Sequence, residues 1–137
     1  MKLVKVYERR GRAYQNHHAT SVYKDRHLFG IDGERGANGL KCVEFITGKE
    51  VPKWDKTDEN EAAQIGQATV VLAGDHLLLQ TAGGDVCLAE ANPKEFKLLG
   101  RVPKVLSGKN NWASPVLVDG RIYLRDEQNV VCLDVRP

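Results

Sequence analysis

The chain has 137 residues, of which 42% are apolar and 28% are charged, a composition typical of one folded domain rather than of a disordered segment. Its 20 basic and 18 acidic residues leave a net charge of +2, which excludes the strongly basic character of most nucleic-acid-binding surfaces. No apolar run approaches the roughly 20 residues of a membrane helix. We therefore expect neither nucleic-acid binding nor membrane insertion.

The first predicted element is a strand at residues 2–8 (KLVKVYE), rich in β-branched and aromatic side chains. After it the chain repeats one pattern three times, and each copy reads as strand, tight turn, strand, turn, strand. The matching first halves of the copies are residues 18–32, 67–81 and 112–126. Leu28, Leu77 and Ile122 occupy one repeat position. Self-similarity at a period of about 45 residues is the signature of a repeat architecture.

Tight turns separate the first two strands of each copy. The clearest is Asp119-Gly120 in the third copy, because both central residues of such a turn readily adopt positive φ. Gly74-Asp75 and Asp25-Arg26 stand at the same place in the second and first copies. No segment keeps a 3.6-residue apolar period, so we expect no helix beyond a turn within residues 58–64.

A fourth strand is predicted after the third strand of the first two copies, at residues 50–54 and 95–102. The third copy has none after its third strand, whereas residues 2–8 form a strand without a unit. We therefore divide the single domain, residues 1–137, into units of about 17–54, 66–106 and 111–137, the last completed by residues 2–8.

Three cysteines stand at equal spacings of 45 residues, at Cys42, Cys87 and Cys132. An odd number argues against a closed set of disulfides. Because they recur with the repeat, we interpret them as small packing residues in the third strand of each unit, too far apart to bond or to share a metal ion.

The repeats resemble those of the pyrroloquinoline-quinone-type β-propellers, whose docking motif is close to A-x-D-x-x-T-G-x-x-x-W. Residues 42–52 match it with Cys42, Glu44, Thr47 and Gly48, while the Trp position falls on Pro52 and Trp54 follows two residues later. Residues 77–101 and 110–135 are similar to the C-terminal end of quinoprotein-like and outer-membrane-assembly-type propellers. The relatives are usually exported, but the chain shows no export signal and its compartment is left open.

The resemblance implies an all-β fold, a β-propeller arc of three four-stranded antiparallel blades. Propellers typically close with 4–8 blades, so an arc of three would leave the apolar faces of its two terminal blades exposed to solvent. We expect closure by head-to-tail oligomerisation, with a dimer favoured and a trimer possible, unless the blades belong to a longer propeller. Residues 2–8 would then pair with residues 130–135 of a neighbouring chain.

The residues that precede each first strand are the candidates for an axial channel: Asn16, His17, His18, Gln67, Asn110, Asn111 and Trp112. His18, Gln67 and Trp112 share one repeat position and would converge on the axis. The alternative is a purely structural role, in which His18 and Trp112 only pack between blades. Adjacent His17 and His18 point to opposite faces of an extended chain, which disfavours a metal site.

Quinoprotein dehydrogenases carry an aromatic platform, a calcium site and a catalytic aspartate, and no segment here matches these elements. We therefore expect no catalytic residue, no cofactor and no metal, and interpret the chain as a non-catalytic scaffold or protein-binding module. The alternative is a fragment of a quinoprotein-like dehydrogenase that lacks its catalytic blades.

Overall fold

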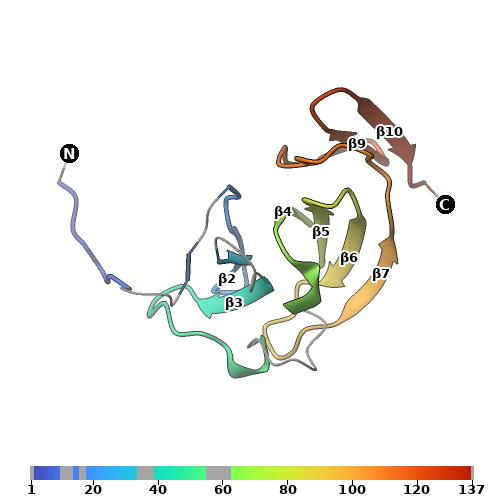
Figure 1. Ribbon diagram of the computed structural model, residues 1–137. Coiled ribbons are helices and arrows are strands. Elements are labelled where there is room, and N and C mark those ends of the chain that lie inside the picture. Colours follow the sequence, from blue (N-terminus) through green and yellow to red (C-terminus); the bar gives the residue numbers. More distant parts are fainter. Residues whose placement is uncertain (1, 10–13, 16–17, 34–38, 55–62, 137) are drawn as a thin grey trace.

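The computed structural model describes residues 2–9, 14–15, 18–33, 39–54 and 63–136. In this part of the chain the protein is all-β, with three antiparallel sheets that lie side by side in a row (Figure 1). The first sheet has the order β1-β2-β3, with β1 Val22–Lys24, β2 His27–Asp32 and β3 Gly39–Glu44. The second has the order β4-β5-β6-β7, with β4 Ala68–Ala73, β5 His76–Thr81, β6 Val86–Glu90 and β7 Leu98–Val102. The third has the order β10-β9-β8, with β8 Val116–Val118, β9 Arg121–Arg125 and β10 Val130–Asp134.

The first hairpin of each sheet closes at the turn that the sequence predicts. Asp25 and Arg26 have φ of 48° and 64°, and Asp119 and Gly120 have φ of 49° and 70°. Gly74 has φ of 60°. Positive φ at both central residues matches the right-handed twist of the flanking strands, which is why this turn type joins two-residue hairpins. The three turns occupy the same repeat position, since the pairs that flank them are Lys24–His27, Ala73–His76 and Val118–Arg121.

The cysteines lie in the third strand of each sheet, as predicted, but not in one register. Cys42 pairs with Phe29 and Cys132 with Tyr123, which are equivalent repeat positions, whereas Cys87 pairs with Leu79, one position further on. The connections between β5 and β6 and between β9 and β10 both have four residues, but the first contains Gly84 at φ 90° and its strands pair in a register shifted by one residue. The prediction that all three cysteines are equivalent is therefore wrong by one residue for Cys87.

Fourth strands follow the prediction only in the second sheet, where residues 95–102 contain β7. In the first sheet the predicted strand at residues 50–54 is wrong: Glu50 makes a single bridge to Val43, and Pro52–Trp54 forms the 3₁₀ turn η1. Pro52 lacks an N–H group for the ladder, so the chain turns inward there. A second 3₁₀ turn, η2, spans Ala63–Ile65, and the rest of the turn predicted within residues 58–64 lies largely outside the described residues.

Residues 2–8 are not a strand in this structure. They run on the side of the first sheet that faces away from the second, at the opposite end of the row from β10 (Figure 1). Residues 2–8 do not pair with residues 130–135 of the same chain, and their pairing with those of a neighbouring chain stays a prediction.

Two apolar cores hold the row together. The larger lies between the first and second sheets and includes Phe29, Leu40, Leu77 and Leu79, each at most 1% exposed. Trp54 is buried in this core from η1, with Phe29 and Phe96 edge-on against its ring. The smaller core lies between the second and third sheets, and its buried members are Leu78, Val86, Leu106, Ile122 and Leu124.

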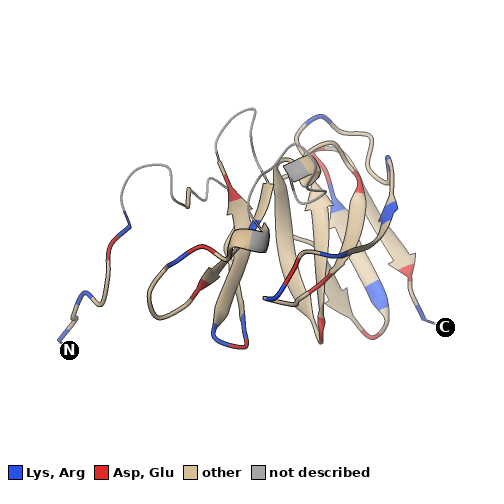
Figure 2. Cartoon of the chain, turned by 90° about the horizontal axis from the view of Figure 1, so that it is seen from below, with Lys and Arg blue, Asp and Glu red and all other residues tan. Residues whose placement is uncertain are grey.

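Basic and acidic residues are interspersed along the sheets and turns of the chain in Figure 2. One ion pair links neighbouring sheets, between Lys24 of β1 and Asp75 in the turn of the second sheet. Neither sign dominates the face seen in this view, in keeping with the near-neutral net charge.

Candidate functional site

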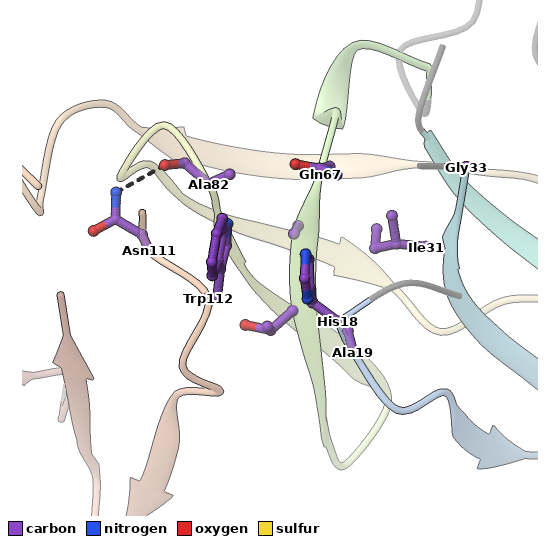
Figure 3. A pocket seen from close by; sticks show the side chains of 10 residues that line it. His18, Ala19, Ile31, Gly33, Gln67, Ala82, Asn111 and Trp112 are labelled. Atoms are coloured by element: carbon purple, nitrogen blue, oxygen red, sulfur yellow. Dashed lines mark hydrogen bonds between the residues drawn. The ribbon is translucent and has the colours of Figure 1, made fainter. Parts of the chain in front are cut away.

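The segments that lead into the first strands of the three sheets meet around one small pocket. His18 comes from the segment before β1, Gln67 stands immediately before β4, and Trp112 lies in the segment before β8 (Figure 3). The pocket wall also includes Asn111, Ile31 and Gly33. The structure thus brings together four of the seven residues proposed as axial-channel candidates.

His18 and Trp112 form the most defined contact at this pocket. Their rings are stacked, with centroids 4.6 Å apart and planes inclined by 12° (Figure 3). Trp112 is nevertheless 47% exposed. The stack joins the segment before the first sheet directly to the segment before the third.

Asn111 anchors the segment before β8 to the second sheet. Its side chain is 1% exposed, and its Nδ2 donates hydrogen bonds of 2.8 Å to the carbonyl oxygens of Ala82 and Gly108. Thr69 adds a hydrogen bond from its hydroxyl to the Ala113 carbonyl oxygen, at 3.3 Å. These bonds fix the position of Trp112, which lies between Asn111 and Ala113 in the chain.

Gln80 is a buried residue at this junction that the sequence analysis did not single out. It is fully buried, and its Nε2 donates to the carbonyl oxygens of Asn111 and Arg125, at 3.3 and 3.2 Å. It therefore ties β5 to two segments of the third sheet. A signal was present, because Gln80 is a polar residue directly after the apolar run of residues 77–79, within the second strand predicted for that copy.

Of the remaining candidates, Asn110 takes no part in the pocket. Its side-chain amide donates to Glu127, at 2.9 Å, on the surface of the third sheet. Asn16 and His17 lie outside the described residues. The pocket therefore rests on His18, Gln67, Asn111 and Trp112 alone among the predicted set.

The pocket is too small for an organic ligand. The volume open to the centre of a water molecule is about 20 Å³, which is enough for about one water. Small-molecule sites commonly measure about 300–1,000 Å³. In the single chain this junction can therefore position segments and hold a solvent molecule, but it does not enclose a substrate.

A polar cluster occupies the opposite face of the first sheet. Lys41 is 6% exposed, and its Nζ lies 2.8 Å from Glu50 and 3.2 Å from the buried carboxylate of Asp32. Burial opposes the charged form of Lys41, but the hydrogen bond to Glu50 and the charge of Asp32 outweigh it, so the pKa of Lys41 is raised. Asp32 also accepts a hydrogen bond of 2.6 Å from the backbone N–H of Gln15.

Tyr14 covers the same face next to this cluster. Its hydroxyl lies 2.7 Å from the Ser21 hydroxyl and directly over Gly30, where any Cβ would collide with it. Burial raises the pKa of Tyr14 to about 12, although the hydrogen bond to Ser21 acts in the opposite direction. The absence of a side chain at Gly30 is thus what lets the phenol lie against the sheet.

The three cysteines are free thiols, in agreement with the prediction that residues at equivalent positions of separate units lie too far apart to form disulfides. Burial raises the pKa of Cys42 to about 12 and also raises that of Cys87, whereas Cys132 is exposed. Thiols with raised pKa values are poor nucleophiles at neutral pH. Among the residues that the structure describes, no three His, Cys, Asp or Glu side chains gather into a metal-binding group, and no helix of the described chain has the length and apolar character needed to cross a membrane.

A search with protein-family models and a search of curated protein sequences each found no match to this chain. The resemblance to pyrroloquinoline-quinone-type repeats therefore remains a prediction from the residues. The structure itself supports the coarser class of an all-β protein built from small antiparallel sheets.

Proposed function

We propose that this chain is a non-catalytic β-propeller segment that acts as a scaffold, binding further sheets through its terminal sheet faces. The observation that carries the proposal is that both contacts between neighbouring sheets use the same repeat positions. Leu77 and Leu79 of the second sheet face the first, and the equivalent Ile122 and Leu124 of the third face the second. A contact that repeats in this head-to-tail way continues until a ring closes.

The opposite faces of the strands repeat in the same manner. Phe29 of the first sheet packs toward the second, and Leu78, its equivalent in the second sheet, packs toward the third. The next equivalent is Tyr123, which is 37% exposed and points away from the row. The third sheet therefore offers the position that the first two sheets use for packing.

The outward face of the third sheet combines apolar side chains near Tyr123 with Arg121, Arg125 and Asp134, which the strand pairing places on the same face. Val116 and Cys132 pair with Tyr123 across β9, and side chains directly opposite one another in antiparallel strands share a face. Val116 is 56% exposed, and Val118 and Val130 on the same face are 46% and 75% exposed. Contiguous exposed apolar residues of this kind mark interaction surfaces.

The outward face of the first sheet presents a matching aromatic pair. Tyr23 is 52% and Phe45 43% exposed, and their rings meet edge to face, with centroids 5.1 Å apart. Association of the third sheet of one chain with the first sheet of another would cover both surfaces. Two chains supply six sheets and three chains nine, so a dimer falls within the usual 4–8 blades.

The experiment is the molar mass in solution, measured by light scattering on a size-exclusion peak. We expect the mass of two chains for the natural sequence and of one chain for Tyr123→Lys, because a charge would be buried in the contact. Leu99→Lys is the matched control, since Leu99 is 41% exposed on β7 and outside the outward face of the third sheet. A monomeric natural sequence, or equal masses for the two lysine variants, would overturn the proposal.

A further inference from the structure

The N-terminal segment, residues 2–9, exposes large apolar side chains that no described sheet covers. Leu3, Val4 and Val6 are 85%, 73% and 79% exposed. The segment has the composition of a strand but belongs to none of the three sheets. Tyr7 lies against Gly48, at the turn that follows β3, and so keeps the segment next to the first sheet.

The segment occupies the same place in the repeat as β7. Residue 8 precedes His18 by as many positions as Val102, the end of β7, precedes Trp112 (18 − 8 and 112 − 102). His18 and Trp112 are themselves equivalent repeat positions. In the second unit this stretch forms the fourth strand of the second sheet and leads into the third sheet. By position, residues 2–8 are therefore the fourth strand of a sheet that would stand before the first.

An edge strand is available at the other end of the row. In the described chain β10 pairs only with β9, whereas the equivalent strand of the second sheet, β6, pairs with β5 on one side and β7 on the other. An open edge of this kind is a template for an added strand. The N-terminal segment cannot reach it within one chain, because the segment and β10 lie at opposite ends of the row (Figure 1).

An apolar groove lies between the second and third sheets and reaches the end of β10 at Val135. It has a volume of about 400 Å³ and is lined by residues of all four strands of the second sheet. Gly100 and Val102 of β7 form one wall, and Leu117, Ile122 and Val135 form the other. Val135 directly follows β10, so a strand added to β10 would run beside β7 and place apolar side chains over the groove.

We propose that residues 2–8 of one chain add to β10 of a second copy as the fourth strand of its third sheet. The inference rests on the proposed head-to-tail association and specifies the partner surface. It accounts for three features at once: the uncovered apolar segment, the open edge of β10 and the apolar groove that reaches Val135 at the end of β10.

Cys132 provides the test, because it is an exposed thiol on β10 itself. Lys5→Cys, Val6→Cys and Tyr7→Cys are prepared separately, oxidised mildly and analysed on non-reducing gels. Successive side chains of a strand point to opposite faces, and directly opposite Cβ atoms lie about 4.5–5.5 Å apart. We therefore expect covalent dimers either from Val6→Cys alone or from Lys5→Cys and Tyr7→Cys, and loss of these dimers when Cys132→Ser is added.

Equal cross-linking at all three positions, no cross-linking at any, or cross-linking that survives Cys132→Ser would overturn the inference. The natural sequence, oxidised in parallel, controls for disulfides between two Cys132 residues. Since Cys42 and Cys87 are buried, they do not compete in the folded chain.

A second measurement separates this inference from the proposed function. The chain without residues 2–8 is compared with the full chain by light scattering over a dilution series, with far-UV circular dichroism as the folding control. We expect the dissociation constant to rise at least about tenfold, because several apolar side chains lose a buried site. An unchanged dissociation constant would overturn strand donation while leaving the sheet-face contact in place; a monomeric full chain would overturn both.

Discussion

The imidazole of His18 lies nearly parallel to the indole of Trp112, with 4.6 Å between ring centroids, although the two residues belong to the first and third repeats. The second sheet separates the first and third sheets along most of the row (Figure 1). At the pocket it does not, since the segments before β1 and β8 meet there beside Gln67 (Figure 3). The three residues of one repeat position therefore meet at the pocket, although the sheets that follow them are separated.

Replacing Trp112 with alanine removes this stack and should lower the free energy of unfolding by about 1 kcal/mol, since aromatic pairs contribute about 0.5–1.5 kcal/mol beyond area burial. Urea unfolding followed by circular dichroism measures the change. Trp112→Phe keeps a ring over His18 and should lose less. A double-mutant cycle with His18→Ala isolates the pair, and additive losses would show that the two rings do not interact.

Lys41 is the charge on which the buried polar cluster of the first sheet depends. Lys41→Met should destabilise the fold by about 3–5 kcal/mol, because it removes the Lys41 charge that lies against the buried carboxylate of Asp32. Glu50→Gln is the control, since Lys41 still contacts Asp32 and the Glu50 side chain is 28% exposed. We expect a loss of about 1 kcal/mol or less for it in the same urea titration. Equal losses would mean that Glu50, not Asp32, is the important partner.

Features that neighbouring residues determine could be predicted from the sequence, whereas features that depend on contacts between distant segments could not. The hairpin turns at Asp25-Arg26 and Asp119-Gly120 were predictable because two residues determine them. The fourth strand at residues 50–54 was predicted wrongly. Burial of the Trp54 side chain in the core and the missing N–H of Pro52 override the strand propensity of the segment. The register of Cys87 was missed because it depends on the conformation of the β5–β6 turn, where Gly84 has φ of 90°, and not on the repeat spacing, which is the same in the third copy.

The candidate site shows the same division. The shared repeat position of His18, Gln67 and Trp112 indicated that they would be neighbours. The stacking of His18 on Trp112 was not predictable, since it depends on where Asn111 and Gln80 hold the segment before β8. The cluster of Lys41, Asp32 and Glu50 gave no sequence signal, because its members are brought together only by pairing of β2 with β3 and the bridge at Glu50.

Gly84 and Gly74 offer a matched pair of turn substitutions. Both have positive φ, at 90° and 60°, but an added Cβ at Gly74 meets no atom within 4 Å, whereas at Gly84 it would collide with the carbonyl oxygen of Leu106. Gly74→Ala should therefore cost only the backbone strain of about 1–2 kcal/mol. Gly84→Ala should cost clearly more, because Leu106 N also donates a hydrogen bond to Gly84 O and the two backbones cannot separate freely. Equal midpoints of urea unfolding for the two variants would contradict the close approach.

Tyr14 should make stability fall in alkaline solution. Its pKa is raised to about 12 in the folded chain by burial, against about 10 in an unfolded one. Between these values the folded state binds more protons than the unfolded state, so its contribution is fully present below about pH 10 and is lost as pH rises toward 12, at no more than about 1.4 kcal/mol per pH unit. Urea unfolding at pH 8, 10 and 11 measures this loss.

Tyr14→Phe is the control that assigns the alkaline loss to one residue. At pH 8 it should be less stable than the natural chain by about 1 kcal/mol, because the hydrogen bond to Ser21 is gone. Cys42, whose pKa burial also raises to about 12, contributes an alkaline loss to both proteins that begins about one pH unit lower. The gap between the two proteins should therefore narrow as pH rises above 10, while both become less stable. Parallel curves would show that the Tyr14 hydroxyl titrates alike in the folded and unfolded states, and that it does not lie buried over Gly30.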